Sequence, residues 1–179
     1  GSGNTYDPNT NILVKSDEID IPETLSWTNQ GIPYNLSGSF RIGSASGTTI
    51  EIEAGTEILM SSDAEILVAY ETNTFGVIKA NGTASQPILI GSASPFPSAG
   101  DWYGIWFYDG TGAGTSFEHC EISYGGGFGY GGNLVFYDDV ANNVFLNDVT
   151  ISYSNQYGIY RNNASFSLPT MNNVSFVSN

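Results

Sequence analysis

The chain is short of cations, cysteines and long apolar runs, and each shortage excludes a class of protein. Lys and Arg number 4 against 18 Asp and Glu among 179 residues, which gives a formal net charge of −14. We therefore expect no nucleic acid partner, because proteins hold phosphate backbones with clustered cations. The one cysteine, Cys120, cannot form an internal disulfide. No apolar run approaches the roughly 18 residues of a membrane span, so no membrane insertion is expected.

The chain also lacks helical periodicity and has few charged residues. No long segment repeats apolar residues at the i, i+3, i+4, i+7 spacing of a surface helix. Charged residues make up only 12%, so the polar surface depends on Ser, Thr, Asn, Gly and Tyr. Glycine occurs 22 times and aromatic residues make up 13%. This combination of turn formers and strand formers indicates an all-β protein.

A repeat without gaps occupies the C-terminal half of the chain. Two sets of apolar residues recur there with the same spacings, 29 residues and then 25 residues. The first set is Phe117, Leu146 and Met171, and the second is Ile105, Leu134 and Ile159. Shared spacings indicate one repeated β-coil that buries its apolar inward face by stacking on its neighbours. We expect turn residues to form polar ladders as well, with Asn147 over Asn172.

The repeat is less regular upstream of residue 104. Residues 76–80 have the apolar pattern of residues 104–108, so we expect these two segments to stack one coil apart. Residues 49–53, 57–60 and 65–68 alternate apolar and polar side chains and are predicted strands.

The repeat also suggests domain boundaries. We interpret residues 1–3 as an expression scar, residues 4–40 as an N-terminal cap or appendage, and residues 41–179 as the repeated domain. The chain stops at Asn179 just after a predicted strand, so we expect the domain to be truncated at its C-terminal end. An uncapped last coil exposes a strand edge, which favours end-to-end self-association.

Several stretches resemble secreted and cell-surface bacterial proteins with a right-handed parallel β-helix, in the pectate-lyase-like superfamily. They are IEIEAGT (50–56), IKANGT (78–83), QPILI (86–90), GDWYGIW (100–106) and FEHCEISYGG (117–126). The resemblance implies an extracellular or cell-surface location, although no signal segment is visible in this sequence. With the repeat, it predicts an all-β fold: a single-stranded right-handed parallel β-helix (β-solenoid) with an N-terminal cap.

The catalytic motifs of this superfamily's enzymes are missing. The one histidine is His119, in Glu-His-Cys, and the few basic residues do not form the base of a lyase site. A polysaccharide-degrading enzyme of the glycoside hydrolase type, or a fragment of one, stays an alternative through Asp109, Asp138 and Asp139. The same carboxylates are a weak candidate for Ca²⁺, and no other cofactor is expected. A role in the turns that follow two strands explains these residues better.

Aromatic residues give the stronger candidate site. If Ile105 points inward, then Trp106 and Tyr108 point outward, and Tyr137 and Tyr160 follow one and two coils later. We expect an exposed strip that stacks on sugar rings. The alternative is that the loop at residues 125–132 covers these rings. The leading prediction is a non-catalytic extracellular or cell-surface module that is carbohydrate-binding, adhesive or a spacer, with a glycan or cell-surface partner.

Two reactive residue types are expected to be structural. His119 aligns with Asp148 and Asn173 at a turn position. Cys120 aligns with Val149, which predicts a small buried side chain rather than a nucleophile.

Overall fold

The computed structural model describes residues 5–7, 10–15, 18–19, 23–129 and 131–179. Within them the chain forms strands and one short 3-10 helix, η1 (Ala141–Asn143). The strands are β1 (Ile12–Lys15), β2 (Glu18–Ile19), β3 (Thr24–Trp27), β4 (Tyr34–Ser37), β5 (Ser39–Ile42), β6 (Thr48–Ile52), β7 (Glu57–Met60), β8 (Glu65–Val68), β9 (Gly76–Asn81), β10 (Ile88–Ser92), β11 (Gly104–Phe107), β12 (Thr115–Ser123), β13 (Gly132–Phe136), β14 (Val144–Ser152), β15 (Tyr157–Arg161) and β16 (Thr170–Val177). The described residues contain no helix long and apolar enough to cross a membrane.

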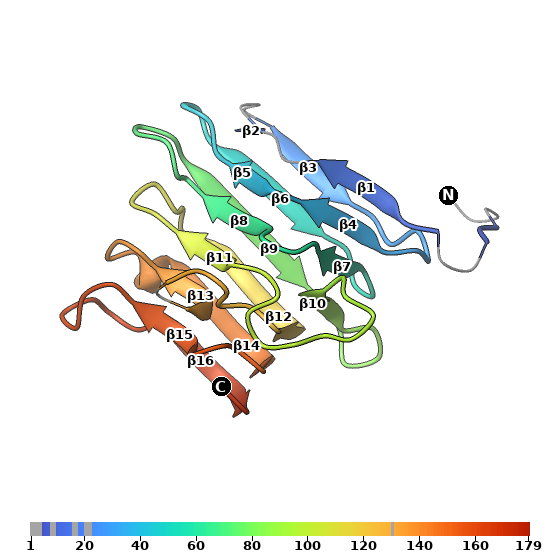
Figure 1. The fold of residues 1–179 in the computed structure, drawn as a ribbon. Coiled ribbons are helices and arrows are strands. Elements are labelled where there is room, and N and C mark those ends of the chain that lie inside the picture. Colours follow the sequence, from blue (N-terminus) through green and yellow to red (C-terminus); the bar gives the residue numbers. More distant parts are fainter. Residues whose placement is uncertain (1–4, 8–9, 16–17, 20–22, 130) are drawn as a thin grey trace.

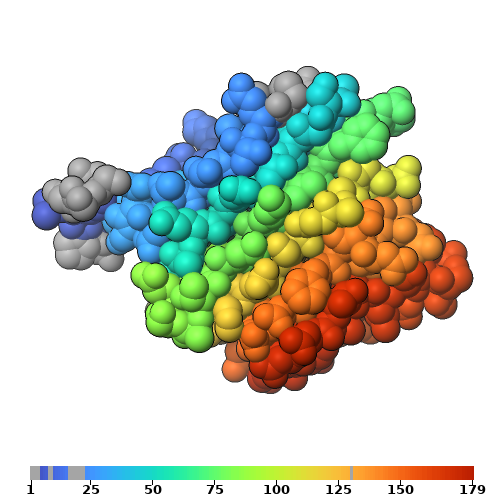
Figure 2. All heavy atoms as spheres, turned by 180° about the vertical axis from the view of Figure 1, so that it is seen from behind, coloured from blue at the N-terminus to red at the C-terminus, as the bar shows by residue number. Residues whose placement is uncertain are grey.

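The strands build a parallel β-solenoid with two sheets, which we call sheet A and sheet B (Figure 1). Sheet B has the order β15-β13-β11-β8-β5-β2, and sheet A holds the other ten strands. Each coil contributes one strand to sheet B and one or two to sheet A. Successive coils lie against one another as bands along the molecule (Figure 2). The predicted all-β solenoid is confirmed.

The later coils cross sheet A with one long strand, whereas the earlier coils use two short ones. In β12, β14 and β16 a single residue with positive φ bends the strand: His119 (46°), Asp148 (53°) and Asn173 (50°). These residue types tolerate the left-handed region better than most. They also stack: His119 Nε2 lies 3.8 Å from an Asp148 oxygen, and the Asn173 amide donates to Asp148. The turn position predicted for His119 is this bend.

The inward side chains form one continuous apolar core. Phe107 stacks on Phe136 with ring centroids 4.9 Å apart and meets Phe117 edge to face at 6.3 Å. Cys120 is fully buried, as predicted, and its thiol donates to the Ala80 carbonyl at 3.1 Å. Burial of such a core is the main stabilising contribution in a fold of this kind.

The predicted register of the C-terminal coils is confirmed. Ile105, Leu134 and Ile159 are direct partners along sheet B, and Phe117, Leu146 and Met171 are partners along sheet A. The predicted polar ladder is also present, because the Asn172 amide donates to Asn147 Oδ1 at 2.6 Å.

Two predictions about the N-terminal half are wrong. Residues 4–40 were expected to form a cap, but β3 pairs in parallel with β6, and β4 pairs with β7. The solenoid therefore begins upstream of residue 41, where Gly and Pro turns interrupt the apolar pattern without ending it.

Residues 76–80 were expected to stack with residues 104–108, but β9 pairs with β6 and β12 in sheet A. The strand that pairs with β11 is β8. Short strands of similar alternation are interchangeable in a sequence comparison, and only their pairing separates them.

Candidate functional site

The outer face of sheet B carries a second apolar cluster, separate from the core. It consists of Leu67, Trp106 and Val135, all at most 5% exposed. These residues are direct neighbours on β8, β11 and β13. Because the coils are in register, one outward position per coil produces a continuous column. Arg41 and Tyr160 extend this column at its two ends.

A ladder of tyrosines stands beside this column. Tyr70, Tyr108 and Tyr137 each follow the end of a sheet B strand, at the point where the chain turns toward sheet A. The ring centroids of Tyr70 and Tyr108 are 5.0 Å apart, and those of Tyr108 and Tyr137 are 5.2 Å apart. The exposed fraction of Tyr137 is 43%, which leaves much of this residue open to solvent.

Two loops supply the opposite wall. Phe128 lies 5.2 Å from the Tyr103 ring and 6.4 Å from the Trp106 ring, measured between centroids. The buried Asn133 holds the Phe128 loop in place, because its Oδ1 accepts a hydrogen bond from the Gly125 N–H at 2.7 Å. The Phe128 loop is thus tied to sheet B at its base.

The outer face of sheet B, the tyrosine ladder and the two loops line an open pocket of about 440 Å³, which we call the aromatic pocket. A volume of this size suits a small organic ligand. Its lining residues are Arg41, Glu65, Leu67, Tyr70, Tyr103, Trp106, Tyr108, Phe128 and Tyr137. Most of this lining is aromatic, with a single cation and a single carboxylate among the charged groups.

The charged side chains of the aromatic pocket are held by contacts with neighbouring residues. The Arg41 guanidinium lies 3.1 Å from Glu71 Oε1 and 5.1 Å from the centroid of the Tyr70 ring. Glu65 accepts a 2.6 Å hydrogen bond from the Ser39 hydroxyl. Both charged side chains are therefore oriented before any ligand arrives.

The site is electrostatically negative. Burial, followed by the nearby carboxylate of Glu65, raises the pKa of the Tyr108 hydroxyl well above its usual value. The pKa of Tyr103 is raised by burial, by a hydrogen bond with Asp63 and by the same Glu65. The Tyr103 hydroxyl is already engaged with Asp63, whereas the Tyr108 hydroxyl keeps its proton over a wide pH range and can donate to a ligand.

Trp106 carries an unusual polar group. Its indole N–H is buried and has no acceptor among the described residues. A buried donor without a partner typically costs about 1–3 kcal/mol.

The predicted aromatic strip is only partly exposed. Trp106 points outward as expected, but it is covered, so the prediction that it forms an exposed platform is wrong. Tyr108 is half-buried and Tyr137 is exposed, and both line the aromatic pocket. Tyr160 is half-buried against Val135 and lies outside the pocket lining. The weighed alternative, cover from the loop at residues 125–132, applies to Trp106.

Sequence analysis missed Tyr70, Tyr103, Phe128, Arg41 and Glu65. A signal existed for Tyr70, because it follows residues 65–68, a segment whose alternation matches that of β11. A signal existed for Tyr103 too, because it directly precedes β11 and recurs as Tyr157 two repeats later, whereas no periodicity marks Phe128, which lies in a loop.

The three candidate carboxylates lie in turns. Asp138 Oδ2 accepts a 3.1 Å hydrogen bond from the Asp109 N–H, and Asp139 Oδ1 accepts one of 2.8 Å from the Ser167 N–H. These contacts give Asp138 and Asp139 a structural role at the strand ends. Among the described residues there is no group of three or more His, Cys, Asp or Glu placed to hold a metal ion. The catalytic and Ca²⁺ roles stay untested predictions.

Comparison with known proteins gives a family and no individual relative. The family model described as "Pectate-lyase like beta helix domain" matches residues 20–155, which is more than half of the chain. No curated protein matches the chain, and no solved structure matches it. The match begins within the segment that sequence analysis had interpreted as a cap, in agreement with the strand pairing.

Proposed function

The chain belongs to the pectate-lyase-like β-helix family, and we propose that this member is a non-catalytic carbohydrate-binding module of the extracellular space or cell surface. The observation that supports the proposal is the aromatic pocket, in which rings from sheet B and from two loops surround about 440 Å³. The family includes enzymes and non-catalytic modules, so the argument depends on the site rather than on the fold.

Carbohydrate suits this lining because a sugar ring has apolar faces and a polar edge. Its C–H faces stack on aromatic rings, and Tyr137 offers an exposed ring for this purpose. Its hydroxyls need donors and acceptors, which the Tyr108 hydroxyl and the Glu65 carboxylate supply. A few fixed polar groups on an apolar lining are the usual composition of a small-ligand site.

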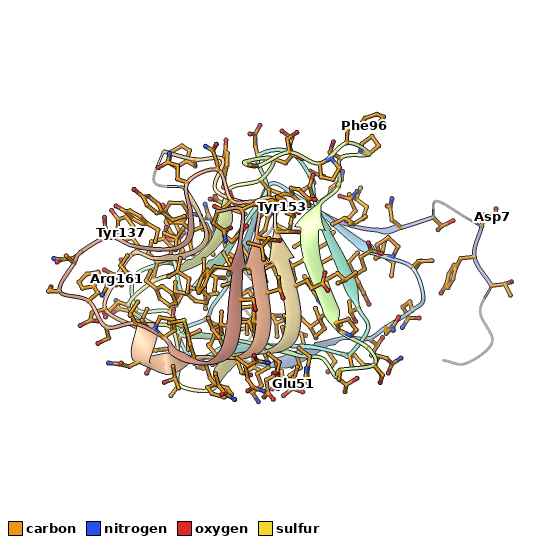
Figure 3. All side chains as sticks on the ribbon, turned by 90° about the horizontal axis from the view of Figure 1, so that it is seen from below. Asp7, Glu51, Phe96, Tyr137, Tyr153 and Arg161 are labelled. Carbon is orange, nitrogen blue, oxygen red and sulfur yellow. The ribbon has the colours of Figure 1, made fainter. Side chains whose placement is uncertain are left out.

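The test is affinity electrophoresis of the whole chain in gels cast with neutral and charged polysaccharides. We expect retardation in at least one gel, with the polymer left intact. Tyr137→Ala should reduce the retardation roughly tenfold, since it removes a stacking ring and little of the fold. The matched control is Phe96→Ala, because Phe96 is 86% exposed and lies well apart from Tyr137 (Figure 3).

Three results would count against the proposal. Equal loss in Tyr137→Ala and Phe96→Ala would place binding elsewhere on the surface. Unretarded migration in every gel would leave an adhesive or spacer role instead. A zone of cleared polymer that disappears in Asp138→Asn would show an enzyme.

A further inference from the structure

The aromatic pocket also has a preferred charge of ligand. We infer that it selects a sugar carrying a protonated amine over the neutral sugar of the same shape. This inference rests on the proposed carbohydrate binding and specifies its ligand class.

Carboxylates outnumber cations around the aromatic pocket. Glu65 lines it, Asp63 bonds to the Tyr103 hydroxyl, and Asp138 is close enough to act on Tyr108. The one cation, Arg41, is already paired with Glu71 at 3.1 Å. A cationic ligand therefore meets the Glu65 carboxylate in the lining, and Asp63 and Asp138 behind the tyrosines add to the same negative field.

The aromatic lining adds a second attraction for a cation. The negative face of an aromatic ring attracts ammonium and guanidinium groups, more strongly where water is excluded. Arg41 shows this contact within the site, because its guanidinium lies 5.1 Å from the centre of the Tyr70 ring. Beyond Tyr70 and Tyr108, which pack against each other, the exposed ring of Tyr137 is open to a ligand amine.

The pocket is therefore complementary to one chemical group at two levels. The Glu65 carboxylate and the aromatic rings of the lining both favour a positively charged group. An amino sugar carries an amine and hydroxyl oxygens on a single ring. A neutral sugar has the hydroxyls but lacks the amine.

The experiment is isothermal titration calorimetry with three tetrasaccharides of the same linkage: glucosamine, N-acetylglucosamine and glucose. Slightly acidic buffer keeps the amines protonated, and about 0.15 M salt screens long-range attraction. We expect the glucosamine form to bind roughly 3- to 30-fold more tightly than the glucose form. Acetylation should abolish this preference, because it removes the charge.

An acidic protein attracts any polycation. The variants must therefore distinguish binding in the pocket from attraction by the net negative charge of the whole protein. Glu65→Gln keeps the side-chain shape and should remove most of the preference for glucosamine. Glu121→Gln is the matched control, since it removes one carboxylate from an exposed position on sheet A. Urea unfolding of both variants checks that the fold is unchanged.

The outcomes separate this inference from the proposed function. Equal binding of the glucosamine and glucose forms, or equal losses in Glu65→Gln and Glu121→Gln, would overturn the inference and leave sugar binding intact. Absence of binding for all three tetrasaccharides, together with unretarded migration in every polysaccharide gel, would overturn both.

Discussion

The outer faces of sheets A and B follow the same alternation and have opposite chemistry. On sheet A, Glu51, Lys79 and Ser116 are neighbours in one outward column, and Asn147 lies under Asn172 in the adjacent column. On sheet B, the outward column holds Leu67, Trp106 and Val135, all buried. In Figure 3 the labelled Glu51 and Tyr137 lie on different sides of the solenoid.

This difference shows how a solenoid acquires a binding surface. Parallel register places equivalent residues of successive coils about 4.8 Å apart, so a choice repeated at one position becomes a column. The side chains of a polar column hydrogen-bond to one another and to water, so the column needs no cover. An apolar outward column needs cover, and on sheet B tyrosines and the loop bearing Phe128 supply part of it. The uncovered remainder is the aromatic pocket.

The largest expected effect separates the inner and outer sides of sheet A. Burial raises the pKa of the Cys120 thiol to about 12, so the reactive thiolate is scarce in the folded protein. At mildly alkaline pH, alkylation of Cys120 should be about 1000-fold slower than that of an unperturbed thiol. Iodoacetamide labelling followed by mass spectrometry measures the rate.

A cysteine at the adjacent outward position is the control for this prediction. Glu121→Cys places a thiol on the exposed face of the same strand, and it should react at an ordinary rate. Equal rates at positions 120 and 121 would contradict the buried position of Cys120.

The second effect compares aromatic residues on the two outer faces. Trp106→Ala should lower the free energy of unfolding by about 3–5 kcal/mol, because Trp106 is buried although it lies outside the core. Phe145→Ala on sheet A, where Phe145 is 37% exposed, should cost less than about 1 kcal/mol. Urea unfolding measures both losses. Similar losses in the two variants would contradict the claim that the outer face of sheet B is buried and that of sheet A is exposed.

The third effect concerns the polar ladder of sheet A. Asn147→Ala removes the acceptor of the 2.6 Å hydrogen bond from Asn172 and should cost about 0.5–1.5 kcal/mol. The same urea titration tests it. A cost near that of Trp106→Ala would mean that the ladder, and not only the apolar column, stabilises the coils strongly.

The smallest effect is expected from the ion pair on sheet A. Lys79 Nζ lies 3.1 Å from Glu51 Oε1, and both side chains are more than one third exposed. Lys79→Met should therefore change stability by less than about 1 kcal/mol, and the change should shrink as salt is added. Thermal unfolding at low and high salt measures it, and a salt-independent loss would point to packing instead.

The fold was predictable where one pattern repeats, and less so where it is interrupted. Phe117, Leu146 and Met171 were placed correctly because each coil must present an apolar residue at the same inward position. Residues 76–80 were placed one strand away from their true partners, because a short alternating segment fits either sheet. The pairing of β3 with β6 was missed because turn residues obscure the repeat there.

The sequence predicted which side chains of the candidate site point outward, but not how far each is exposed. The alternation around Ile105 correctly turned Trp106 outward, and Tyr108 and Tyr137 do line the aromatic pocket. Part of the cover on Trp106 comes from Phe128, in a loop held by the buried Asn133. No local pattern encodes that contact.

By itself the sequence determined the coil, its inward residues and its lack of clustered cations, because alternation and composition act within each coil. Only the tertiary structure decided that outward aromatic residues on sheet B form a pocket and not an open strip. The physical reason is that loops of unequal length fold across the register of the strands. The loop after Gly125 brings Phe128 against Tyr103 and Trp106, and all three line the same pocket as Tyr137.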